Sequence, residues 1–222
     1  GVPSGAVAVT GNLTVVGPSS AGWAVAGPSI PADPVTLNAS MVNAQKGETK
    51  ADGVTVKLSD TGTLSFVWVG ATGSTANLIF DVTGYFVAGT SGAWFVPINP
   101  LRVADTRIGL PAQGPIGTSS PVAVPVAGHA HIPWAAVGMS GNLTVVGQTA
   151  AGFLTAAPVA PTTSPPTSTL NFPVGDTRAN GFAVRLNHDV GLAPDGSIGV
   201  VYFATSGSST HFVVDVTGYF TP

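Results

Sequence analysis

The feature that most constrains this chain is an internal repeat. Residues 80–86 read FDVTGYF, and residues 214–220 read VDVTGYF. A second motif, GNLTVVG, occurs at residues 11–17 and returns at residues 141–147. Two motifs repeated in the same order indicate a duplicated structural unit. The sequence therefore predicts two tandem domains, residues 1–90 and residues 91–222.

Each copy consists of short apolar runs between turn signals. Residues 54–58 (VTVKL) and 64–69 (LSFVWV) alternate in the manner of strands, and residues 35–42 form a further expected strand. The 29 Gly and 19 Pro residues punctuate these runs, and no long stretch has helical periodicity. Short strands at close spacing are typical of an all-β sandwich or barrel. We expect two tandem sandwich-like or barrel-like domains.

Charge is scarce. Charged residues make up 8% of the chain, against about 25% in an average protein, and the net charge is −3. Seven Lys and Arg cannot neutralise a row of phosphates, which excludes nucleic acid as a partner. The densest charge, in residues 45–53, is expected at a solvent-exposed hairpin tip. So little charge gives weak repulsion between copies and favours a protein that packs against others.

Two further absences limit the chemistry. There is no Cys, so disulfides and thiolate metal sites are excluded. No apolar run reaches the roughly 18 residues of a membrane helix, so we expect no membrane span. The chain begins at Gly1 rather than Met, which favours a processed product or a fragment.

Residues 94–131 precede the second copy and have no counterpart before Val2. The first domain is therefore expected to lack an N-terminal block. A sandwich without those strands leaves backbone groups unpaired and invites strand pairing. Another chain could fill the gap, as in pilins, or the block could fold back onto the first domain. A third possibility is that Gly1 is the cut end of a longer repeat array. In the polymer interpretation, the subunit interface contains Trp94, Phe95, Ile98, Leu101 and Val103.

The motifs at the two ends of the second copy resemble a known module. RVADTR at residues 102–107 and the closing motif are similar to a repeat of secreted and cell-surface bacterial proteins. The resemblance covers residues 94–222 fully and residues 1–86 in part. It implies an extracellular, β-rich accessory module with no catalytic residues and no cofactor. Its signature residues are Arg102, Asp105, Arg107, Asp81, Gly84, Tyr85, Asp215, Gly218 and Tyr219.

Several residues have a chemical interpretation beside a structural one. On one strand, His129 and His131 would share a face and could bind zinc or copper, with His188 and His211 arriving by folding. The triplets 105–107 and 176–178, both Asp-Thr-Arg, could bind a sugar or a carboxylate, but an Asp that holds a turn while Arg packs across it is the favoured interpretation.

Two acidic residues and the tryptophans also have both a chemical and a structural interpretation. Asp81 and Asp215 occupy equivalent places in different domains, so an acid pair for glycoside hydrolysis is disfavoured. Four tryptophans could stack on sugars, although Trp68 lies in an apolar strand and is expected in the core. These are Trp23, Trp68, Trp94 and Trp134.

The function expected from the sequence is that of an extracellular structural subunit of a surface filament, coat or appendage, without enzymatic activity or cofactor. Its expected partners are copies of itself. The alternative is a module that binds carbohydrate or cell-wall polysaccharide. A secreted hydrolase is a third class, and the ten scattered Asp and Glu residues argue against it.

Overall fold

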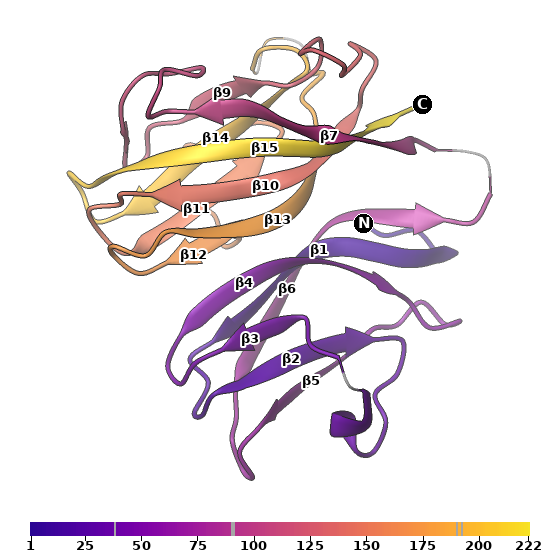
Figure 1. Ribbon diagram of the computed structural model, residues 1–222. Helices are drawn as coiled ribbons and strands as arrows, with labels where there is room; N and C mark the ends of the chain where they lie inside the picture. Colours follow the sequence, from indigo (N-terminus) through magenta and orange to yellow (C-terminus); the bar gives the residue numbers. More distant parts are fainter. Residues whose placement is uncertain (38, 90–91, 190, 192) are drawn as a thin grey trace. The chain divides into compact units, whose positions relative to one another are not determined.

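The computed structural model describes residues 1–37, 39–89, 92–189, 191 and 193–222. Strands make up 53% of the chain, and the sole helical element in the described part is a 3₁₀ turn, η1 (Pro34–Leu37). The chain divides into two compact units, unit 1 (Gly1–Ser91) and unit 2 (Gly92–Pro222). Each is a pair of open antiparallel sheets rather than a closed barrel (Figure 1). The predicted all-β fold is confirmed, in its sandwich form.

Unit 1 contains two three-stranded sheets that enclose apolar side chains. One sheet has the order β4-β1-β6 and the other the order β3-β2-β5. The strands are β1 (Ala6–Val16), β2 (Gly22–Gly27), β3 (Val42–Ala44), β4 (Thr49–Lys57), β5 (Ser65–Gly70) and β6 (Asn77–Val87). At one side of the sandwich, β6 and β5 are therefore the edge strands.

Unit 2 contains the same six strands and three more. One sheet has the order β13-β10-β15-β7, with β8 also paired to β15, and the other has the order β12-β11-β14-β9. The shared strands are β10 (Gly138–Val146), β11 (Gly152–Ala157), β12 (Leu170–Phe172), β13 (Arg178–Arg185), β14 (Ser197–Ala204) and β15 (Ser209–Thr221). The additional strands are β7 (Trp94–Asp105), β8 (Ile116–Gly117) and β9 (Val122–Pro125).

The registers show that the two copies are equivalent residue by residue. Asn12 on β1 pairs with Asp81 on one side and with Gly53 on the other. Asn142 on β10 has the matching neighbours, Asp215 and Gly181. Both sheets carry the same irregularity two residues earlier, just before the repeated glycine. The predicted alignment of the repeats is therefore confirmed through the paired strands.

A close backbone approach explains the glycine in the GNLTVVG motif. A Cβ atom on Gly11 would lie 2.4 Å from the carbonyl oxygen of Asp81, and one on Gly141 would lie 2.4 Å from that of Asp215. Any larger residue must push the neighbouring strand away. The repeated motif thus records a local packing requirement that both units share.

The three additional strands complete the core of unit 2. Block 94–131 contributes buried apolar side chains to one continuous cluster that spans both sheets; they are Val103, Ala104, Ile116, Val124, Val126 and Ala127. In unit 1, the buried side chains instead form two separate smaller clusters. The block stays with unit 2, pairing along β15 and β14, as Figure 1 shows for β7 and β9.

Two sequence predictions need correction. The strand expected at residues 35–42 is wrong for all described residues except Val42, where β3 begins; η1 forms at its start because Asp33 Oδ1 accepts a hydrogen bond from Val35 N and Pro34 favours a turn. Residue 38 lies outside the described residues. The charged segment 45–53 is not a hairpin tip, because residues 45–48 cross from β3 in one sheet to β4 in the other and residues 49–53 are already part of β4.

None of the described helical residues forms a segment long and apolar enough to cross a bilayer.

Candidate functional site

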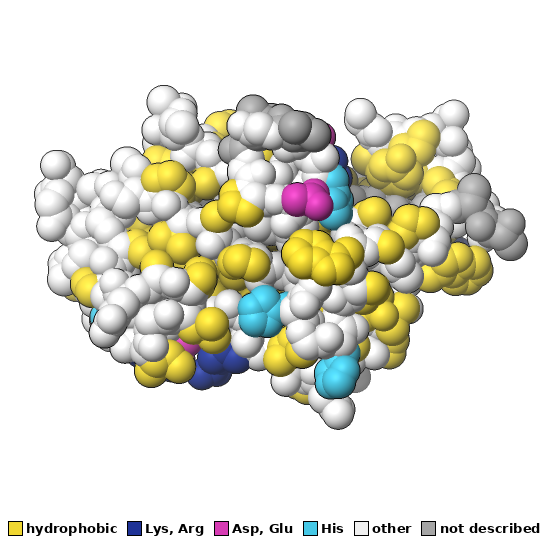
Figure 2. Space-filling view, turned by 90° about the horizontal axis from the view of Figure 1, so that it is seen from above, with side chains coloured by type: hydrophobic (Ala, Val, Ile, Leu, Met, Phe, Trp, Pro, Cys, Tyr) yellow, Lys and Arg dark blue, Asp and Glu magenta, His cyan; other side chains and the backbone are white. Residues whose placement is uncertain are grey.

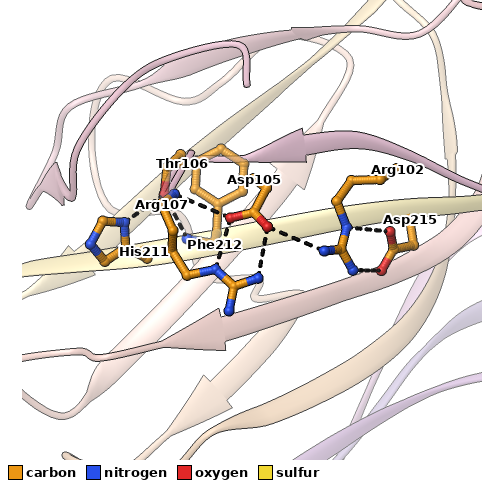
Figure 3. Close-up of polar contacts among 7 residues, drawn as sticks. All are labelled: Arg102, Asp105, Thr106, Arg107, His211, Phe212 and Asp215. Carbon is orange, nitrogen blue, oxygen red and sulfur yellow. Dashed lines mark hydrogen bonds and ion pairs between the residues drawn. The ribbon is translucent and has the colours of Figure 1, made fainter. Parts of the chain in front are cut away.

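The two signature motifs meet in an ion cluster on β7 and β15 of unit 2. Arg102 binds Asp215 with two parallel hydrogen bonds, from Nε to Oδ1 at 2.9 Å and from Nη2 to Oδ2 at 3.1 Å (Figure 3). Its Nη1 also donates to Asp105 Oδ2 at 3.2 Å. The bidentate geometry makes this a directional link between the opening and closing strands.

Asp105 is the centre of the cluster. It is only 2% exposed, and it accepts hydrogen bonds from the backbone N, Nε and Nη2 of Arg107 at 3.1, 2.8 and 2.7 Å. These bonds, together with the charges of Arg107 and Arg102, hold the pKa of Asp105 at about 2 against an ordinary value of 3.8. The carboxylate is thus paired and satisfied.

The neighbouring Thr106 fastens the same turn to β15. Its backbone N donates to the carbonyl oxygen of Phe212, and Phe212 N donates to Thr106 Oγ1, both at 3.2 Å. Thr106 Oγ1 also lies 3.0 Å from His211 Nδ1. In the triplet 105–107, Asp105 therefore holds the turn while Arg107 packs across it, which is the structural interpretation that the sequence favoured.

The pKa of Asp105 predicts acid sensitivity of unit 2. The depression from 3.8 to about 2 corresponds to roughly 2.5 kcal/mol of stability, at about 1.4 kcal/mol per pH unit. This contribution is fully present above pH 3.8 and is lost as the pH falls toward 2. We expect the urea midpoint of unit 2 to fall between pH 4 and pH 2, measured by hydrogen exchange of its strands. An unchanged midpoint across that range would contradict the prediction.

Unit 1 carries the counterpart of Asp215 without its arginine. Asp81 occupies the same register on β6, but its carboxylate has no hydrogen bond or ion pair to any residue that the structure describes. Burial alone acts on it and raises its pKa above 3.8. Protonation of Asp81 therefore favours folded unit 1 as the pH falls, opposite in sign to the effect of Asp105 in unit 2.

The strand that carries Asp81 exposes apolar side chains that its counterpart buries. Val82 is 46% exposed where Val216 is fully buried, and Ile79 is 45% exposed where Val213 is 3% exposed. The side chains in unit 2 are covered because β7 and the loop after it lie against β15. The open side of β6 in unit 1 is hence an apolar edge with one unpaired carboxylate, which we call the open edge.

The second sheet of unit 1 is open on the same side. In unit 2, β9 pairs with β14 and Val200 is fully buried, whereas the equivalent Phe66 on β5 is 37% exposed. The Phe66 ring packs on Phe80 of β6, with centroids 5.6 Å apart, and so bridges the two sheets where their inner faces are uncovered. Both sheets of unit 1 thus lack the edge strand that block 94–131 supplies in unit 2.

The predicted interface residues divide into two groups. Val103 is wholly buried in the core of unit 2, and Ile98 and Leu101 pack against that core. Ile98 and Leu101 remain partly exposed, and Trp94 and Phe95 are the most exposed of the five; their place at a subunit interface stays a prediction. The sequence analysis did not single out Ile79 and Val82, because only the structure shows that their counterparts on β15 are buried.

The other candidate sites do not assemble. His129 and His131 lie in a turn instead of on a strand, and no group of three His, Cys, Asp or Glu within the described ranges is placed to hold a metal. Arg178 binds Asp176 through Nε at 2.7 Å and through Nη2, which repeats the intramolecular pairing of the first triplet.

The tryptophans differ in their surroundings. Trp68 packs against a core cluster of unit 1, as expected, and donates to Ser74 Oγ at 3.3 Å. Trp94 and Trp134 are exposed, and Trp23 is half-buried. In the view of Figure 2, most side chains are hydrophobic or uncharged, and charged groups are few. This surface offers little electrostatic repulsion to a neighbouring protein.

Comparison with known proteins adds no relative to this picture. No family model matches the chain. No curated protein and no solved structure matches it either.

Proposed function

We propose that this protein is an extracellular structural subunit of a surface filament, coat or appendage, and that subunits join by complementing the open edge of unit 1. The observation that carries the proposal is the contrast between β6 and β15. The two strands share sequence and register, but β7 covers only β15. An uncovered strand with exposed apolar side chains is a template for pairing with another chain.

Two further properties support an assembly role. The sparse charge allows close packing of copies. The open edge lies in one unit only, so the chain is asymmetric along its length. An edge that joins to a different surface of the next copy makes a heterologous contact, and repeated heterologous contacts build open filaments. The extracellular location rests on the resemblance to secreted repeat modules.

The test is the assembly state of the 222-residue chain. We expect open-ended oligomers that grow with protein concentration, measured by size-exclusion chromatography with light scattering, and filaments or sheets in negative-stain images. Ile79→Lys should reduce the assembly because a lysine on an exposed edge disfavours strand pairing. Ile108→Lys is the matched control, since Ile108 is 72% exposed in a turn of unit 2. A monomer at all concentrations would refute self-assembly.

A second candidate function is binding of surface polysaccharide. The observation that favours it is Trp134, which is 67% exposed and rests on Gly128, where a Cβ would lie 2.4 Å from the indole ring. A supported, exposed indole can stack on a sugar ring. Retention on insoluble cell-wall polysaccharide that is lost in Trp134→Ala would favour this function.

A further inference from the structure

Unit 2 displays what fills the place that is open in unit 1. On β15, Asp215 pairs with Arg102, Val216 with Leu101, and Gly218 with Pro97 of the antiparallel β7. Because β6 has the same register against β1 as β15 has against β10, the residues of β6 that are equivalent to these three can be identified. They are Asp81, Val82 and Gly84.

The carboxylate of Asp81 is the first sign that unit 1 is built for such a strand. In unit 2, the equivalent carboxylate receives a bidentate guanidinium. Asp81 is partly buried and desolvated without any compensating donor in the described chain. Leaving a desolvated carboxylate unpaired is unfavourable, and an incoming arginine would remove that cost.

Gly84 is the second and independent sign. At the equivalent Gly218, a Cβ would lie 2.3 Å from the Phe95 ring, so the glycine is needed to admit that ring. At Gly84, a Cβ would meet only Thr10 Cγ2, at 3.0 Å, and the backbone is not in the left-handed region. No ring occupies the space over Gly84 within unit 1. Gly84 thus leaves room for an aromatic ring, and no described side chain of unit 1 fills that space.

The apolar side chains exposed around Asp81 and Gly84 are those whose equivalents in unit 2 are buried or covered by an aromatic ring. Val82, Ile79 and Phe66 are exposed where their unit 2 equivalents are buried. Phe86 is 37% exposed, and its equivalent Phe220 packs on the Phe95 ring with centroids 5.2 Å apart. A strand that brings only an arginine would leave these side chains uncovered, so the fit requires apolar residues as well.

We propose that the open edge binds an extended polypeptide segment of the same kind as residues 94–131, antiparallel to β6, with an arginine opposite Asp81 and an aromatic ring over Gly84. This inference deepens the proposed function and rests on it for the biological setting. Block 94–131 already completes unit 2 of its own chain, so the occupant is a second segment of this kind.

The direct test titrates the full chain with a synthetic peptide of residues 92–131. We expect saturable binding of one peptide per chain by isothermal titration calorimetry, with new hydrogen-exchange protection in β6 (Asn77–Val87). Asp81→Lys should weaken binding at least tenfold, because a paired charge becomes a repulsive one. A peptide carrying Arg102→Glu should bind Asp81→Lys better than the original peptide does. Asp60→Lys, in an exposed turn of unit 1, is the matched control and should leave binding unchanged.

A fusion keeps the test decisive if the free peptide aggregates. A copy of residues 92–131 is placed before Gly1 through a Gly/Ser linker, which gives it a high effective concentration at the open edge. We expect slower exchange of β6 than in the parent chain, and loss of that protection with Asp81→Lys. No protection in either format, protection confined to β15, or binding indifferent to Asp81→Lys would overturn the inference.

The outcomes separate this inference from the proposed function. If the chain polymerises but neither peptide nor fusion protects β6, the assembly role stands and the inference fails. If the peptide binds in the stated register while the chain alone remains monomeric, the inference stands and self-assembly fails.

Discussion

Replacing Asp105 with asparagine is expected to lower the free energy of unfolding of unit 2 by about 2–4 kcal/mol. The carboxylate is buried and accepts hydrogen bonds from Arg102 and Arg107 at once. Asparagine keeps the shape but removes the charge that neutralises two guanidinium groups. The measurement is urea unfolding followed by hydrogen exchange of β7 and β15, which separates unit 2 from unit 1.

Asp176→Asn supplies the control for this effect. It stands in the second Asp-Thr-Arg triplet and also pairs with an arginine, but its side chain is 41% exposed. Exposed ion pairs contribute about 0–1 kcal/mol, so the loss should stay within that range. Asp105→Asn should also abolish the fall in the stability of unit 2 between pH 4 and pH 2. Equal losses from the two variants would show that the burial of Asp105 is not what makes it important.

The repeat explains why so much of the fold followed from the sequence. Short motifs such as GNLTVVG encode packing requirements that recur, as the close approach at Gly11 and Gly141 shows. Residues 94–131 have no counterpart in the first copy of the repeat, which predicts that unit 1 has fewer strands. The structure has β7, β8 and β9 in unit 2 alone.

What the sequence did not predict depends on contacts between distant residues. Arg102 and Asp215 are far apart in the sequence of unit 2. Only the pairing of β7 with β15 brings their side chains into contact. The alternation of the Trp94–Val103 segment did not show which of its side chains face the core of their own unit. The prediction that His129 and His131 share one face of a strand is wrong for a local reason. Ala130 between them has a positive φ and closes a turn.

The largest contrast is expected between Val216→Asp and Val82→Asp, the same substitution at equivalent positions of the two units. Val216 is fully buried in the core of unit 2, on the strand paired with β7, and a buried unpaired carboxylate there should cost unit 2 at least about 4 kcal/mol. Val82 is 46% exposed at the open edge, so an aspartate there remains hydrated. Its cost to unit 1 should be below about 1 kcal/mol. Hydrogen exchange in urea, followed separately for β6 and β15, measures both values.

The contrast should disappear when the open edge is occupied. In the chain fused to an additional copy of residues 92–131, Val82 acquires the surroundings of Val216, and Val82→Asp should then remove the protection that the fused block confers on β6. A Val82→Thr variant is the milder control, because a hydroxyl at a newly buried site costs about 1–3 kcal/mol against several for a charge. If Val82→Asp destabilises unit 1 of the unfused chain as strongly as Val216→Asp destabilises unit 2, β6 is already covered in solution. The difference between the two valines would then not mark a binding edge.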